Sequence, residues 1–239
     1  MYAKALAACL LATACRYEPK PASILLFNGR GTSAGDVAAV ENVLRNAHLS
    51  YTTANSRQLG VMTSTQLGTY QLLIVPGGNF VQIGNSLTPD AVTNLRDAVH
   101  GGLNYLGICG GAFFAGNSPY NGLNLTSGVH FPFSAAEGRG VRKAALRIAI
   151  AGSSSLEQYW EDGPQLTGWG DVVAKYDDGT PAVVQGTFGS GWVMLLGTHP
   201  EAPDTWHHGL RFSASGTAAR AYATTLITAA LKATPLQHY

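Results

Sequence analysis

The sequence predicts an α/β chain built on a mostly parallel, doubly wound sheet, with further antiparallel strands in the C-terminal half. Three observations predict it. Apolar runs alternate with segments of helical spacing in the first half, these runs end at glycine-rich turns, and the chain finishes in an Ala- and Leu-rich helical segment. The 239 residues, of which 46% are hydrophobic and 12% charged, suffice for one domain with a substantial core.

The first strand and helix are predicted from residues 23–47. Residues 23–27 are an apolar run that ends at the turn beginning Asn28-Gly29. Ser33 and Asp36 then have capping-box spacing, and apolar residues recur at helical intervals as far as residue 47. We therefore expect a buried strand, a turn and an amphipathic helix, in that order.

The same pattern repeats twice before the middle of the chain. Residues 72–75 predict a second strand that ends at Pro76-Gly77-Gly78. Thr88 is the expected N-cap of the next helix, with Pro89 at its first position and Gly101-Gly102 at its end. A third apolar run, residues 103–108, leads directly to Cys109. Strands alternating with helices in this way favour a parallel sheet.

The second half is richer in strands. Strands are expected over residues 145–150, 171–176, 182–187 and 192–196. Asp178-Gly179 and Ser190-Gly191 are typical hairpin turns, so part of the sheet should be antiparallel. Residues 218–233 should form the closing helix.

Residues 1–22 differ from the rest and are interpreted as a signal peptide or lipoprotein-type leader with a tether. Lys4 precedes an apolar run that ends at Cys15 and is too short to span a bilayer. Lipidation of Cys15 would place an exported protein in the periplasm or at the cell surface. The alternative is an N-terminal core segment in a cytoplasmic protein. Residues 23–239 are then one domain, and under the export hypothesis Cys109 is its single thiol.

Charge and motif spacing exclude several functions. A net charge of +1 provides no electrostatic field that would attract nucleic acid or anionic lipid. The expected partner is instead a small-molecule or peptide amide substrate. No nucleotide-binding fingerprint follows the first strand, and no cofactor is expected. His207 and His208 beside Asp204 lack the spacing of metal ligands, so we expect no metal site. The oligomeric state is left open.

Cys109 has the sequence context of a nucleophile. It follows a predicted strand in Gly-Ile-Cys-Gly-Gly, where small neighbours permit a tight turn that exposes the side chain above the sheet. A helix beginning near Gly110 would favour the thiolate. The N–H of Gly110 and the turn Gly77-Gly78-Asn79 could together form an oxyanion hole. The alternative is a small core cysteine in a glycine turn.

His199 and Glu201 are the candidate base and its orienting acid. They follow the strand predicted at 192–196, and Pro200 favours an extended backbone at His199, so both side chains should face the same way. A carboxylate on one imidazole nitrogen leaves the other for a thiol. The alternative is a surface histidine in a proline turn. Substrate-pocket candidates are Asn28, Gly29, Tyr159 and Trp160.

These motifs resemble the class I glutamine amidotransferase-like superfamily. Within it, the sequences at residues 28–33, 76–78, 109–113 and 160–164 are most similar to the N-terminal domain of biotin-protein ligases. The resemblance covers roughly residue 23 to the C-terminus. It implies a flavodoxin-like sheet and a Cys-His-Glu triad at Cys109, His199 and Glu201.

The sequence departs from that family where the substrate would be recognised. Glutamine amidotransferases usually have Gln four residues after the nucleophile, where this chain has Phe113. We also expect neither an ammonia-accepting nor a biotin-activating domain, since residues 23–239 are interpreted as one domain. We therefore expect a cysteine-dependent hydrolase or amidase that acts on an amide or ester other than glutamine. The alternative is a non-catalytic small-molecule-binding or redox-sensing domain that keeps the pocket.

Overall fold

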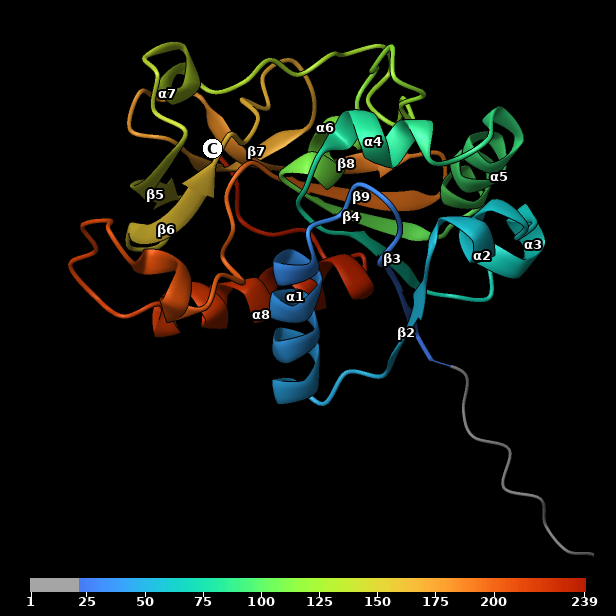
Figure 1. Ribbon diagram of the computed structural model, residues 1–239, viewed down its shortest axis with the longest axis horizontal. Coiled ribbons are helices and arrows are strands. Elements are labelled where there is room, and N and C mark those ends of the chain that lie inside the picture. Colours follow the sequence, from blue (N-terminus) through green and yellow to red (C-terminus); the bar gives the residue numbers. More distant parts are fainter. Residues whose placement is uncertain (1–21) are drawn as a thin grey trace, which may run out of the picture.

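The computed structural model describes residues 22–239, so the leader predicted at residues 1–22 lies, apart from Ala22, outside the described residues. Its centre is a nine-stranded sheet with the order β2-β1-β3-β4-β9-β8-β7-β5-β6 (Figure 1). The predicted fold class is confirmed. The strands are β1 (Ile24–Phe27), β2 (Tyr51–Ala54), β3 (Leu72–Val75), β4 (Asn104–Ile108), β5 (Lys143–Ile150), β6 (Leu156–Glu161), β7 (Asp171–Lys175), β8 (Pro181–Phe188) and β9 (Gly191–Leu196).

The sheet has a parallel half and an antiparallel half that meet at β9. Strands β2, β1, β3, β4 and β9 pair in parallel, and Ile108 at the end of β4 lies beside Leu196 at the end of β9. From β9 onward every pairing is antiparallel. Because β4 and β9 run the same way, the residues that follow them emerge at the same edge of the sheet.

Helices cover both faces of the parallel half (Figure 1). Helices α1 and α8 lie on one face, and α2 to α6 lie on the other, as expected of a doubly wound sheet. The helices are α1 (Ala34–Asn46), α2 (Ser56–Gly60), α3 (Ser64–Leu67), α4 (Phe80–Asn85), α5 (Pro89–His100), α6 (Gly110–Ala115), α7 (Ala135–Gly138) and α8 (Thr217–Leu231), with a 3-10 turn at Asp204–His207.

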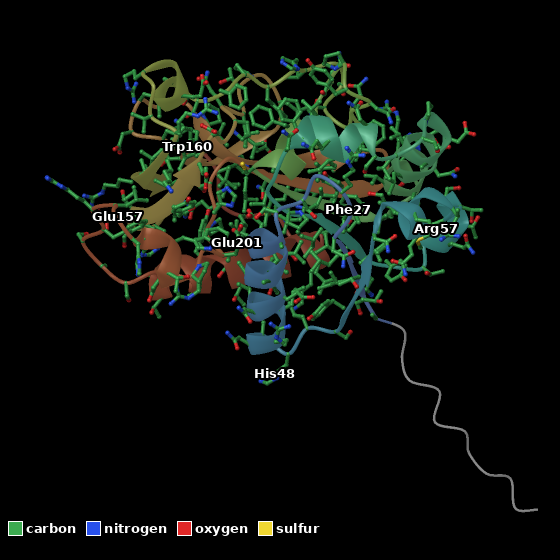
Figure 2. The ribbon with its side chains drawn as sticks, viewed as in Figure 1. Phe27, His48, Arg57, Glu157, Trp160 and Glu201 are labelled. Atoms are coloured by element: carbon green, nitrogen blue, oxygen red, sulfur yellow. The ribbon has the colours of Figure 1, made fainter. Side chains whose placement is uncertain are left out.

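The strands of the parallel half are buried on both faces, which explains their continuous apolar sequences. In β3, Leu72 and Ile74 pack toward α1 and α8, whereas Leu73 and Val75 pack toward α5. Figure 2 shows Phe27 and Trp160 well inside the molecule and Arg57 and His48 at its periphery. Trp160 is fully buried.

Local sequence signals set the ends of the predicted helices. The Ser33 hydroxyl accepts a hydrogen bond from the Asp36 N–H at 3.3 Å and caps α1. Thr88 caps α5 in the same way, with Pro89 at the first helical position and Gly101 at the C-cap. The strand β6 was not predicted, and its residues Tyr159 to Glu161 are extended rather than part of a loop. None of the described helices is long and apolar enough to cross a membrane.

Candidate active site

Cys109 lies at the turn between β4 and α6. Its φ of 48° and ψ of −103° fall outside the regions that side-chain-bearing residues favour, which is the strained geometry of a nucleophile elbow. Neighbouring glycines make the turn feasible, because a Cβ at Gly107 would lie 2.6 Å from the Gly111 carbonyl oxygen. The N–H of Cys109 donates to the Leu196 carbonyl at 2.7 Å and ties the turn to the end of β9.

The Cys109 side chain is 6% exposed and opens onto a cavity of about 580 Å³. Its thiol donates a hydrogen bond to the Glu161 carbonyl oxygen at 3.3 Å. Strand β6 also holds His199, because the Tyr159 carbonyl accepts the His199 N–H at 2.8 Å. One edge of β6 therefore contacts both the sulfur and the backbone of the histidine.

His199 and Glu201 meet as the sequence predicts, but through a different backbone conformation. Glu201 Oε1 lies 2.9 Å from His199 Nδ1 in hydrogen-bonding geometry. Residues 200–201 form a turn closed by the Ala202 N–H on the His199 carbonyl, so the extended-chain argument for the shared side was wrong. Both side chains are buried, and His199 lines the same cavity as Cys109.

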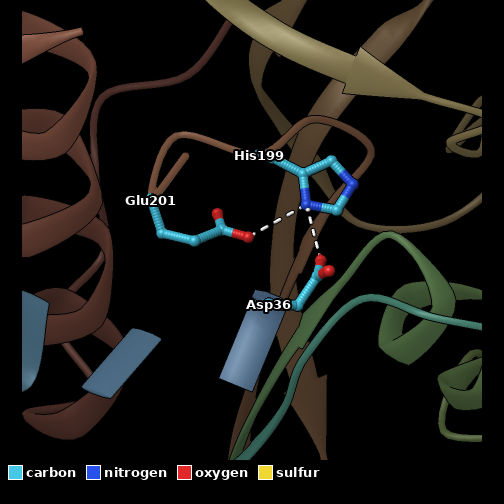
Figure 3. A group of neighbouring side chains, drawn as sticks. All are labelled: Asp36, His199 and Glu201. Atoms are coloured by element: carbon cyan, nitrogen blue, oxygen red, sulfur yellow. Dashed lines mark hydrogen bonds and ion pairs between the residues drawn. The ribbon is translucent and has the colours of Figure 1, made fainter. Parts of the chain in front are cut away.

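Asp36 is a third member of this group that the sequence analysis treated only as a cap residue. Its Oδ1 lies 3.0 Å from His199 Nδ1, so two carboxylates face one nitrogen (Figure 3). The Nδ1–H is directed at Glu201, and Asp36 Oδ1 makes no hydrogen bond. The other ring nitrogen points away from both acids (Figure 3). The sequence contained one indication of this role for Asp36. It follows the predicted first strand, and in a parallel sheet the residues that follow the strands lie at one edge, where Cys109 and His199 also lie.

The charges of this group shift the pKa of each member. Burial lowers the pKa of the His199 imidazole, but the Cys109 sulfur, Glu201 and Asp36 together raise it well above its usual 6.5. Burial raises the pKa of Glu201 more than His199 lowers it. Burial also raises the pKa of Asp36, but the charge of His199 outweighs it and the net pKa is lowered. Asp36 is thus the carboxylate that stays ionised most readily beside an imidazolium.

The predicted glycine turn forms the opposite wall. A Cβ at Gly77 would lie 2.1 Å from Asp36 Oδ1 and 2.6 Å from His199 Cε1, so only glycine fits there. A Cβ at Gly110 would lie 2.4 Å from the Gly78 carbonyl oxygen, which places these two backbones in contact beside Cys109. The N–H of Asn79 donates to the Gly31 carbonyl at 2.8 Å, and the Asn79 side chain caps α4.

The pocket candidates are distributed differently. The structure does not place Asn28, Gly29 or Trp160 on the cavity beside Cys109: Asn28 faces solvent, Gly29 packs on the Phe27 ring, and Trp160 lies in the core. Tyr159 instead lines a second cavity of about 370 Å³, which shares His199 with the first. Sequence analysis missed the aromatic wall of the first cavity, formed by Phe80, Phe113, Tyr120 and Phe133.

Within the described part of the chain, one group of side chains has the spacing of metal ligands: Asp36, His199 and Glu201. Ligand atoms of Asp36, His199 and Glu201 lie within 4.8 Å of one another. Their direct contacts at 2.9 and 3.0 Å already use the His199 Nδ1. The arrangement therefore fits an oriented imidazole better than a cation.

Comparison with known proteins supports the resemblance drawn from the motifs. Residues 22–120 match the family described as "Biotin-protein ligase, N terminal". The match ends before β5 and so includes Cys109, Asp36 and the glycine turn but neither His199 nor Glu201. The expected similarity to this family is confirmed, and the fold is similar to that of a glutamine amidotransferase.

Solved structures extend the similarity of fold beyond this match. A glutamine amidotransferase aligns with a TM-score of 0.59 and 21% identity, over 75% of this chain and 90% of that one. PurLQS from Thermotoga maritima aligns at 0.57 with 14% identity, over 86% and 97% of the two chains. A cytoplasmic protein from Salmonella typhimurium aligns at 0.56 with 13% identity, over 86% and 98%. No curated protein matches the chain. At these identities the likeness concerns the fold alone.

Proposed function

We propose that this protein is a cysteine-dependent hydrolase that cleaves an amide or ester bond through a covalent thioester. The observation that carries the proposal is the shared cavity: a strained cysteine and a histidine oriented by a buried acid open onto the same space at one edge of the sheet. Cys109 is the nucleophile, His199 the base and then the acid, and Glu201 the group that orients the imidazole.

The first half of the reaction forms the thioester. His199 Nε2 takes the proton of the Cys109 thiol as the sulfur attacks the carbonyl carbon. The negative charge that develops on the carbonyl oxygen is stabilised by backbone N–H groups. Gly110 supplies one, because it begins α6 and has no intrahelical acceptor, and Gly78, whose backbone touches it, supplies the other. The bond to the leaving group then breaks, and the leaving group takes the proton from the imidazolium.

The second half returns the enzyme to its starting state. Water gives a proton to His199 Nε2 while its oxygen attacks the thioester carbon. The carbon–sulfur bond breaks, the acid product leaves, and the Cys109 sulfur recovers the proton from the imidazolium. Glu201 keeps the Nδ1–H tautomer throughout, since its Oε1 accepts that hydrogen bond. Asp36, which contacts the same nitrogen, favours the imidazolium in both halves.

The experiment follows acylation of the protein by activated esters and simple amides, with the adduct located by peptide mass spectrometry. We expect an acyl group on Cys109, loss of the adduct and of hydrolysis in Cys109→Ala, and strong slowing of both in His199→Ala. Hydrolysis that persists in Cys109→Ala would overturn the proposal.

A second candidate is a non-catalytic binding domain, with redox sensing by Cys109 as its variant. The hydrogen bond from the Cys109 thiol to the Glu161 carbonyl favours it, because the sulfur is engaged by the backbone rather than by His199. This candidate predicts saturable ligand binding, or reversible oxidation of Cys109 at low peroxide concentrations, with no acyl adduct. Detection of a thioester that hydrolyses in time would decide against it.

A further inference from the structure

An aromatic wall lines one side of the cavity beside Cys109. Phe113 stacks on Phe80 with ring centroids 4.7 Å apart and packs on Phe133 at 4.9 Å. Tyr120 lies edge-on to Phe80 at the rim, with centroids 6.1 Å apart. Phe113 is on α6, the helix that begins immediately after the nucleophile. The wall is therefore positioned by the same turn that positions the sulfur.

This wall leaves apolar surface open to the cavity. Phe133 is 40% exposed and Tyr120 is 45% exposed, although large apolar side chains are otherwise mostly covered in the described residues. Both line the cavity. Apolar surface that gathers in a concave site, rather than scattered singly over the surface, marks a place where a ligand is bound.

The charged residues of the same cavity disfavour an anionic ligand. Arg142, which lines this cavity, is paired with Glu137 at 2.9 Å and with Asp162 at 2.6 Å. Glu161 and Asp36 add further carboxylates. The His199 imidazolium, the other cation of this cavity, is likewise paired with Asp36 and Glu201. A ligand carboxylate would therefore meet acidic groups and two cations that are already engaged, and its desolvation would not be offset.

The position of His199 decides which part of a substrate meets the aromatic wall. The leaving group must lie on the His199 side, because it takes its proton from the imidazole. The second cavity is lined by His199, Tyr159 and Trp206, whereas Phe80, Phe113 and Phe133 line only the first. The acyl group therefore lies against the three phenylalanines.

We infer that the substrate is an uncharged amide or ester whose acyl group is aromatic or otherwise bulky and apolar, held by Phe80, Phe113 and Phe133. This inference rests on the proposed function, since it assigns the acyl side of the same site. Phe113 occupies the place where glutamine amidotransferases usually carry Gln, so the wall also explains why glutamine is a poor candidate.

The test compares three p-nitrophenyl esters that share a leaving group: phenylacetate, acetate and monosuccinate. Acylation rates of Cys109 are divided by the rates with N-acetylcysteine, which removes intrinsic reactivity. We expect phenylacetate to be favoured over acetate by at least about 10-fold, the range that a well-fitted apolar group contributes. Monosuccinate should be the slowest of the three.

Variants test whether the wall causes the preference. Phe133→Ser changes a partly exposed ring and should preserve the fold, and Phe80→Ala is the second variant. Both should reduce the phenylacetate preference about 10-fold. Phe188→Ala is the matched control, because Phe188 pairs with Gly191 at the opposite edge of the sheet, and it should keep the wild-type preference.

Each outcome has a consequence. Acylation without preference, or with preference for monosuccinate, overturns the inference while the hydrolase proposal stands. If no ester acylates Cys109, the hydrolase proposal fails, and binding of phenylacetamide to Cys109→Ala by ligand-observed NMR decides the inference. Binding that exceeds that of acetamide and is lost on adding Phe133→Ser supports the aromatic site, and its absence overturns it.

Discussion

The parallel and antiparallel halves of the sheet contribute different parts of the site. The parallel half carries Cys109, Asp36 and the Gly77-Gly78 turn. The antiparallel half, with the end of β9, supplies His199, Glu201 and the Glu161 carbonyl that accepts the thiol hydrogen bond. The family match at residues 22–120 covers the first set alone. The sequence match to this family thus covers the Cys109 turn and Asp36, but neither His199 and Glu201 nor the β6 wall of the pocket.

The largest effect is expected from the acid of the antiparallel half. Glu201→Gln should reduce kcat/KM about 10³-fold or more, since a neutral partner no longer stabilises the imidazolium or fixes its tautomer. The measurement is hydrolysis of an activated ester under steady-state conditions. Glu157→Gln, a matched change at a partly exposed residue of β6 away from the cavity, should leave the rate unchanged. A small effect of Glu201→Gln would move the orienting role to the parallel half.

A smaller loss is expected from the parallel half at its contact with His199. Gly77→Ala should lower kcat/KM about 100-fold, because the new Cβ would displace Asp36 and the imidazole from their positions. Gly60→Ala is the control in the same half, since a Cβ there meets nothing within 4 Å. Circular dichroism should show the same secondary-structure content for both variants. Full activity of Gly77→Ala would contradict the close contact of Gly77 with Asp36 and His199.

Asp36→Asn tests the two acids directly against each other. We expect a loss of about 10-fold, smaller than for Glu201→Gln, because the Nδ1–H donates to Glu201 and Asp36 acts through charge alone. The pH profile should also move, with the imidazole pKa lowered. Asp90→Asn, in the first turn of α5, is the matched control. Losses of equal size for both acids would mean that they orient His199 jointly.

The smallest effect concerns stability as a function of pH. The pKa of His199 is raised on folding, so its protonation stabilises the fold fully below pH 6.5, and this contribution is lost as pH rises through the folded-state pKa. Urea unfolding of the wild type should show declining stability above pH 6.5, by at most about 1.4 kcal/mol per pH unit from this group. His199→Gln should decline less over the same range, and identical curves would contradict the shift.

Local sequence signals were sufficient to predict most of the fold but only part of the candidate site. The helix caps at Ser33 and Thr88, the buried runs of β1, β3 and β4, and the Cys109 turn depend on near neighbours and were predictable. Asp36 was not, because an acid in the first turn of a helix is common and its contact with His199 spans most of the chain. The prediction of the pocket residues was wrong for a similar reason. The sequence around Trp160 is typical of a pocket lining, but the register of β6 directs this side chain into the core.

The hydrogen bond from the Cys109 N–H to the Leu196 carbonyl joins the ends of the two strands that lead to Cys109 and His199. Cys109 follows β4 directly and His199 lies three residues after β9, so both are anchored to the same hydrogen-bonded pair of strands. Thermal inactivation and global unfolding should therefore be the same event. A heated sample should keep its active centre intact until β4 and β9 come apart, and then lose it together with the rest of the core.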